Sequence, residues 1–254
     1  MRILLTNDDG VHATGLKLLY DIACTLTDDV WVIAPEQEQS GKARAVTLTE
    51  ALRPRQIESQ RWAVNGTPTD CVVLATQMLM AEAPPDLILS GINRGQNLAN
   101  DTSMSGTLAA AFMGSEANIP SIALSLTHGL RYEGSLNWET PKHWGRRVIQ
   151  SAIDAEWDRG ITLNINFPDC EANKVKGIKL TRQGRRDHLT LRTEQRRDLR
   201  GFDYVWIGHE GKLSNPPEGT DLRAIYDGYI SVTPLHLDLT HEPHMASLRQ
   251  HYEG

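Results

Sequence analysis

The sequence predicts an α/β fold in which a mostly parallel sheet carries helices on both faces and is followed by an extension rich in β-hairpins. Short apolar segments alternate with amphipathic segments through the first 126 of the 254 residues. The apolar segments are hydrophobic on both faces, which is typical of parallel strands covered by helices on both sides. The rest of the chain has short strand-like segments separated by polar loops, and these predict the extension.

The composition is that of an ordinary globular protein, with 40% hydrophobic and 23% charged residues and a net charge of −6. It excludes a disordered chain. No apolar run approaches the roughly 18 residues that a membrane-spanning helix requires, and the apolar residues 3–5 are too short for a secretory signal. We expect a cytoplasmic protein without a membrane partner. Cys24 and Cys71 lie in apolar helical patterns, so we expect both in the core.

The first elements follow from periodicity. Residues 2–6 predict a strand that ends in the turn 7–10, Asn-Asp-Asp-Gly. Residues 16–26 have the apolar spacing of a helix face, and residues 30–34 predict a second strand that Pro35 ends. Residues 45–66 predict extended or hairpin structure.

A second helix begins at Thr67, which has the position of an N-cap, with Pro68 and Asp70 in the first turn. Residues 87–89 predict a third strand, and a polar loop is expected from about residue 91 to 105. A helix of small residues over 106–118 and a strand over 121–126 complete this half.

The second half begins with a helix predicted over residues 141–157. Residues 161–167 alternate apolar and polar side chains, which predicts a strand with one polar face. Three further strands are expected over residues 177–181, 204–207 and 229–233.

Ligands of an open parallel sheet bind where the carboxyl ends of the strands meet, and three polar loops leave those ends. In the first loop, Asp8 and Asp9 supply adjacent carboxylates suited to a hard divalent cation, although the tetrapeptide taken alone favours an ordinary turn. Ser40 and Gly41 lie in the second loop. Asn93 follows the third strand.

The third loop leads to Ser105, Gly106 and Thr107 at the predicted start of a helix, where free N–H groups and the helix dipole favour an anion. Ser105 or Thr107 taken singly is equally well explained as a helix cap. A carboxylate pair beside an anion site is the arrangement that phosphoryl chemistry requires. The sequence contains no GxxxxGK[ST], GxGxxG or GxSxG motif.

Together these motifs resemble the SurE family, the survival protein E nucleotidases. The resemblance covers nearly the whole chain and rests on these segments: MRILLTNDDGVHATG, QSGKARAVTLT, NGTPTDCV, PDLILSGINRGQN, SGTLAAA, LNINFP and GTDLRAIYDGYISVTPLHLDLT. It implies a Rossmann-like catalytic core over residues 1–176, and an extension over 177–254 whose hairpin arm exchanges between subunits. It also implies a phosphatase that requires a divalent metal and acts on nucleoside 5′- and 3′-monophosphates.

Carried over residue by residue, the resemblance implies four metal ligands, Asp8, Asp9, Ser40 and Asn93. Of these, Asp8, Asp9 and Asn93 would be catalytic. It implies a phosphate-binding neighbourhood made of Gly41, Asn97, Ser105, Gly106 and Thr107. Thr14 and Met104 depart from the family pattern, and Met104 bears on how the nucleoside is held. The all-oxygen set favours one Mn²⁺ or Mg²⁺ per subunit over Zn²⁺ or Ca²⁺.

We expect a metal-dependent 5′-nucleotidase, with exopolyphosphatase side activity as an additional possibility. A non-catalytic nucleotide-binding regulator on the same fold is the alternative. A phosphatase with an aspartyl nucleophile is a third reading, which the adjacent Asp8 and Asp9 fit poorly.

Residues 177–201 form a basic segment with eight lysines and arginines and three carboxylates. One hypothesis is that this segment recruits RNA or polyphosphate. The hypothesis we favour is an arm that crosses to an acidic surface of a second subunit, which predicts a homodimer or tetramer and no stable nucleic-acid partner.

Overall fold

The computed structural model describes residues 1–128, 136–189, 191–209 and 212–253, so residue 190 of the predicted arm lies outside the described residues. Its main sheet has nine strands within this described part, in the order β3-β4-β2-β1-β5-β6-β7-β11-β8. The strands of this sheet are β1 (Arg2–Thr6), β2 (Asp29–Pro35), β3 (Arg55–Glu58), β4 (Arg61–Val64), β5 (Leu87–Arg94), β6 (Ser121–Leu126), β7 (Thr162–Phe167), β8 (Ile178–Leu180) and β11 (Ile230–Leu235).

Most neighbouring strands are parallel, and the pairs β3–β4 and β7–β11 are antiparallel. The chain runs from β1 to β2 on one side, and later returns to place β5 on the other side of β1. The order therefore reverses between β1 and β5, and such a switch point leaves a crevice at the carboxyl ends of the strands. This confirms the predicted α/β class.

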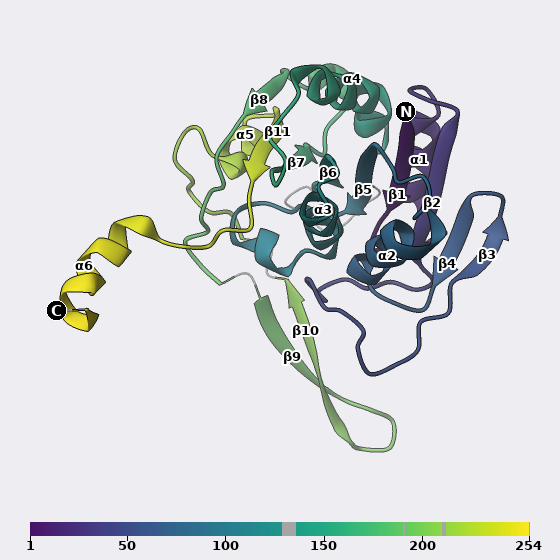
Figure 1. Cartoon of the computed structure of the whole chain (residues 1–254). Helices are drawn as coiled ribbons and strands as arrows, with labels where there is room; N and C mark the ends of the chain where they lie inside the picture. Colours follow the sequence, from purple (N-terminus) through teal and green to yellow (C-terminus); the bar gives the residue numbers. More distant parts are fainter. Residues whose placement is uncertain (129–135, 190, 210–211, 254) are drawn as a thin grey trace.

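The helices cover both faces of this sheet (Figure 1). The remaining elements are α1 (Thr14–Ala23), α2 (Pro68–Leu74), a π-helical turn η1 (Ala75–Leu79), a 3₁₀ helix η2 (Ala99–Met104), α3 (Gly106–Glu116), α4 (Glu139–Ala155), a 3₁₀ turn η3 (Ala172–Lys174), α5 (Asp221–Tyr226) and α6 (Glu242–Tyr252). No helix in the described residues is long and apolar enough to cross a membrane.

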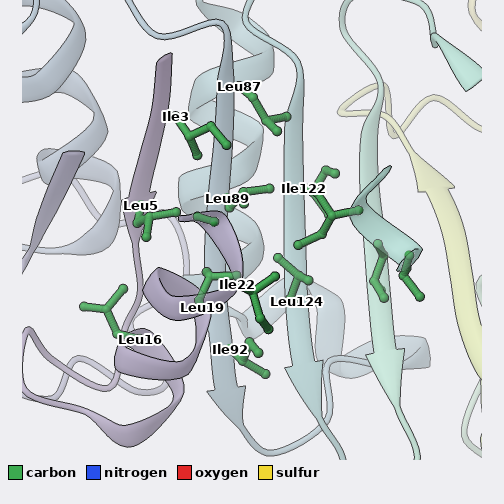
Figure 2. Packing of buried hydrophobic residues seen from close by; sticks show 14 of the residues in the cluster. Ile3, Leu5, Leu16, Leu19, Ile22, Leu87, Leu89, Ile92, Ile122 and Leu124 are labelled. Carbon is green, nitrogen blue, oxygen red and sulfur yellow. The ribbon is translucent and has the colours of Figure 1, made fainter. Parts of the chain in front are cut away.

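The larger core lies between the sheet and the pair α1 and α4, and Figure 2 shows Leu16, Leu19 and Ile22 of α1 against the side chains of β1, β5 and β6. A second core packs α2 and α3 on the opposite face. The capping box predicted at Thr67 is present, since its side chain accepts from the N–H of Asp70 and the Asp70 carboxylate accepts from the N–H of Thr67. The sequence therefore positioned α2 correctly at its start.

Strands β9 (Leu191–Arg197) and β10 (Asp203–His209) form a separate antiparallel hairpin, which we call the arm and which projects away from the sheet in Figure 1. Strand β9 was not predicted, because its residues are almost all polar. The prediction for Cys24 was also wrong: this residue follows the last turn of α1 and is exposed, whereas Cys71 is buried as expected.

Strand β5 runs to Arg94, beyond the predicted end of the third strand. The predicted polar face of β7 exists, but it is buried, as are all six residues of the strand. The asparagines of this buried face hold the segment of chain that leads to the candidate site.

Candidate active site

Asp8 lies directly after β1, at the carboxyl edge of the sheet, and is only 4% exposed. Its Oδ1 accepts a hydrogen bond of 2.6 Å from the Thr107 hydroxyl at the start of α3. A Cβ atom at Gly106 would lie 2.9 Å from the Asp8 Cβ, so only glycine permits this close approach. The structure thus brings the first predicted carboxylate against the first turn of α3, 99 residues away in sequence.

Asp9 is half-buried and faces β5. Its Oδ2 accepts a hydrogen bond of 3.0 Å from the N–H of Arg94, the last residue of that strand. The turn between the carboxylates and α1 is held by Asn7, whose Nδ2 donates to the Gly10 carbonyl at 2.9 Å. Asp9 and the end of β5 are therefore joined across the switch point of the sheet.

Both carboxylates have raised pKa values. Burial raises the pKa of Asp8, although hydrogen bonds from Thr107 oppose this effect. Burial, and next the nearby Asp8 charge, raise the pKa of Asp9 to about 6. Within the described residues neither carboxylate forms an ion pair with a lysine or arginine. The Arg94 charge lowers the pKa of Asp9 only in part, so one buried and one half-buried carboxylate create a negative potential that a bound cation would relieve.

The donor set around these carboxylates fits a hard cation. The Asn93 Nδ2 donates to the Gly95 carbonyl at 3.0 Å, and no group among the described residues donates to its Oδ1. The buried Oδ1 of Asn7 also lacks a partner in the described part of the chain. Where the chain is described, no group of three or more His, Cys, Asp or Glu residues is placed to hold a metal. The available donors are therefore oxygens from two carboxylates and neutral amides.

Ser40 lies in the loop after β2 and is exposed. Its hydroxyl donates to Glu38 at 3.0 Å, and no hydrogen bond within the described residues joins it to Asp8, Asp9 or Asn93. The loop nevertheless contacts the site, because the N–H of Gln39 donates to the Asp8 carbonyl at 2.7 Å. Gly41 has a φ of +76° and open space where a Cβ would be. The structure thus places this loop beside the carboxylates without engaging Ser40.

The predicted phosphate-binding side chains make internal hydrogen bonds. Ser105 caps α3 by accepting from the N–H of Leu108, and the Thr107 hydroxyl is used by Asp8. Asn97 is buried, and its Nδ2 donates to the Ser125 hydroxyl at 2.8 Å. What the start of α3 offers an anion is therefore its backbone and helix dipole.

Sequence reasoning missed how Asn97 is held. The Asn166 Oδ1 accepts from the N–H of Asn97 at 2.9 Å, and Asn164 donates to the Asn97 carbonyl at 2.8 Å. The signal was present, because Asn164 and Asn166 alternate with apolar residues in β7. That alternation predicted a polar face, and α3 and the chain at Asn97 lie against this face and bury it.

Comparisons with known proteins place the chain in a family. A family model described as "Survival protein SurE" matches residues 3–190. A protein of Hyphomonas neptunium named 5′-nucleotidase SurE is 55% identical over 254 residues, which cover 100% of both chains. One of the same name from Parvibaculum lavamentivorans is 51% identical over 95% of this chain and 87% of its own length. The crystal structure of a SurE protein from Aquifex aeolicus superposes with a TM-score of 0.83 at 37% identity, over 98% of this chain and 99% of that one.

Proposed function

The chain belongs to the SurE family, and from that membership we propose that it is a divalent-metal-dependent phosphomonoesterase of nucleoside 5′- and 3′-monophosphates. It is an enzyme, a 5′-nucleotidase, as the full-length identity to relatives of that name indicates. The metal requirement, the 3′ activity and the residue roles are our proposals. The observation that supports these proposals is the pair Asp8 and Asp9 beside the start of α3, which has no ion-pair partner among the described residues.

Asp8, Asp9, Ser40 and Asn93 would hold one Mn²⁺ or Mg²⁺, which when bound lowers the pKa of a water molecule and neutralises phosphate charge. In this arrangement Thr107 fixes the orientation of Asp8 by its hydrogen bond. The backbone N–H of Arg94 does the same for Asp9. Side chains that are already oriented lose little freedom when substrate binds, which favours reaction.

Asp9 is the proposed proton acceptor for the attacking water. It is more accessible than Asp8, so a water molecule can approach its carboxylate more readily. Asp8 is buried and hydrogen-bonded to Thr107, so its proposed role is to hold the cation in place. The start of α3, from Ser105 to Thr107, would receive the phosphate, and Lys42 or Arg94 would assist from the neighbouring loops.

A phosphate-release assay over nucleoside 5′- and 3′-monophosphates, with and without chelator, tests this function. We expect chelation to abolish turnover, and Mn²⁺ or Mg²⁺ to restore it better than Zn²⁺ or Ca²⁺, because the donors are all oxygens. Undiminished turnover after exhaustive chelation would remove the metal and the ligand roles. Nucleotide binding without turnover at any metal concentration would favour the non-catalytic regulator. Inorganic polyphosphate belongs in the same assay as a proposed side substrate.

The arm is the proposed contact to a second subunit, in a homodimer or tetramer. Its exposed apolar side chains include Tyr204, Val205, Trp206 and Ile207 on β10, and contiguous exposed apolar surface favours a protein partner. Recruitment of RNA by the basic residues of β9 is the competing hypothesis. Self-association that persists at high salt supports the first, because nucleic-acid binding weakens steeply with salt.

A further inference from the structure

A buried polar cluster joins η2 to the chain at the base of the arm, outside the proposed ligand set. Its centre is an ion pair between Arg186 and Asp101, whose side chains are only 8% and 12% exposed. The Arg186 Nη2 lies 2.6 Å from the Asp101 Oδ2, and its Nε lies 3.1 Å from each carboxylate oxygen. The contact is therefore a two-point fork, which fixes the carboxylate in orientation as well as in distance.

The same cluster holds the backbone of η2 at several points. The Asp221 Oδ2 accepts from the N–H of Ala99 at 2.8 Å. Gln183 donates to the Ala99 carbonyl and to the Thr102 hydroxyl, each at 2.8 Å. Ala99 has a φ of +51°, a conformation that non-glycine residues adopt only when their surroundings enforce it. The position of η2 therefore depends on partners from residues 183–186 and α5.

η2 ends at Met104, and the next residue is Ser105, the cap of α3. A shift of η2 would therefore displace the backbone N–H groups in the first turn of α3, which are the proposed contacts of the phosphate. A buried ion pair adds little net stability, since apolar residues of similar size would avoid its desolvation cost. What the fork supplies is a defined geometry for the segment that leads into the site.

We propose that Arg186 is a positioning residue for nucleotide binding, which, through its fork to Asp101, holds η2 and so the phosphate-receiving start of α3. This inference rests on the proposed function. Arg186 touches neither the proposed cation ligands nor the reacting atoms. Its removal should therefore weaken substrate binding more than it slows the chemical step.

Initial-rate kinetics with adenosine 5′-monophosphate and Mn²⁺ test this proposal on the full-length enzyme. We expect Arg186→Met to raise KM about tenfold with kcat within about threefold, because a small displacement of a binding group is costly. Arg186→Lys keeps the charge but loses the fork, so its KM should lie between those of Arg186→Met and the wild type. The matched control is Arg196→Met, which removes an arginine paired with Glu194 on the exposed arm and should leave KM unchanged.

Asp101→Asn is the second variant, because it keeps the size of the side chain. It tests the positioning role of the ion pair if Arg186→Met does not fold. An unchanged KM in a folded Arg186→Met or Asp101→Asn enzyme would overturn the proposal. A loss confined to kcat would also overturn it. The failure of both variants to fold would overturn it as well, because the ion pair would then be purely structural. Wild-type enzyme that releases no phosphate in the same assay would instead contradict the proposed function, so the two failures are distinguishable.

Discussion

At the carboxyl edge of the sheet, polar side chains are buried: Asp8 is 4% exposed and Thr107 is fully buried. On the arm the opposite holds, since Trp206 is 61% and Ile207 is 70% exposed. Burying a carboxylate without a counter-ion lowers stability, and exposing large apolar side chains promotes association. Both regions therefore depart from what folding alone favours. The first departure supports the proposed cation site, and the second supports the proposed contact to a second subunit.

The largest expected effect is that of Asp8→Asn, which removes one of the two buried charges and keeps the side-chain size. The Thr107 hydroxyl still has an oxygen to donate to, so we expect the fold to be retained. Turnover should fall about a thousandfold, because a cation held by a single carboxylate is poorly bound and poorly placed. Phosphate release measures the loss, and a thermal melt measures folding.

The control for this variant is Asp21→Asn on the exposed face of α1, which should retain full turnover. Wild-type activity in Asp8→Asn would show that the uncompensated pair is incidental to catalysis.

Gly106→Ala should have the next largest effect. The added methyl group meets the Asp8 side chain at 2.9 Å, so the carboxylate or the start of α3 must move. We expect turnover to fall by about ten- to a hundredfold, because a displacement of this order misplaces a reacting group.

Gly208→Ala is the matched control on the arm, since a Cβ there meets no atom within 4 Å and should leave turnover unchanged. Equal activity in the two variants would contradict the close approach of Asp8 to α3 as a requirement for catalysis.

A smaller effect follows from the raised pKa of Asp9, which is about 6 in the metal-free protein. A cation binds the ionised carboxylate, so affinity for Mn²⁺ should fall as the pH is lowered through 6 and the proton competes. Between pH 7 and pH 5 we expect about a tenfold loss of affinity from this group. Titration calorimetry measures it at each pH.

Asp9→Asn should bind Mn²⁺ weakly and lose most of this pH dependence, since the titrating group is gone. If the variant retained the wild-type pH profile, another group would be responsible for the competition.

Trp206→Ser should have the smallest effect on turnover, but a clear effect on self-association through the arm. A large aromatic side chain at a protein interface often contributes about 2 kcal/mol or more to association. We therefore expect self-association to weaken at least about tenfold while kcat per subunit stays within twofold. Sedimentation velocity over a range of concentrations measures the first quantity.

Arg200→Ser, in the loop between β9 and β10, is the control and should leave the assembly unchanged. Removal of residues 192–208 gives the complete test, because it leaves Gln183 and Arg186 in place. An unchanged sedimentation profile in that protein would refute the arm as the subunit contact.

The sequence predicted the α/β class, the capped start of α2 and the strands over residues 2–6 and 121–126. It also predicted that the loops with Asp8 and Asp9, with Ser40 and with Asn93 meet, because the carboxyl ends of parallel strands converge on one edge. These predictions used signals that are local, such as apolar period, capping residues and the position of polar residues after a strand. Each such signal depends on residues only a few positions apart.

The tertiary structure decided the rest. The polar strand β9 is a strand because β10 pairs with it, and Asn164 is buried because the chain at Asn97 lies against its face of the sheet. The fork of Arg186 to Asp101 joins residues 85 positions apart. Nothing within either segment marks this contact, because only the folded chain brings the two side chains together. Periodicity indicates which residues prefer burial, whereas only the folded chain determines which of these residues contact one another.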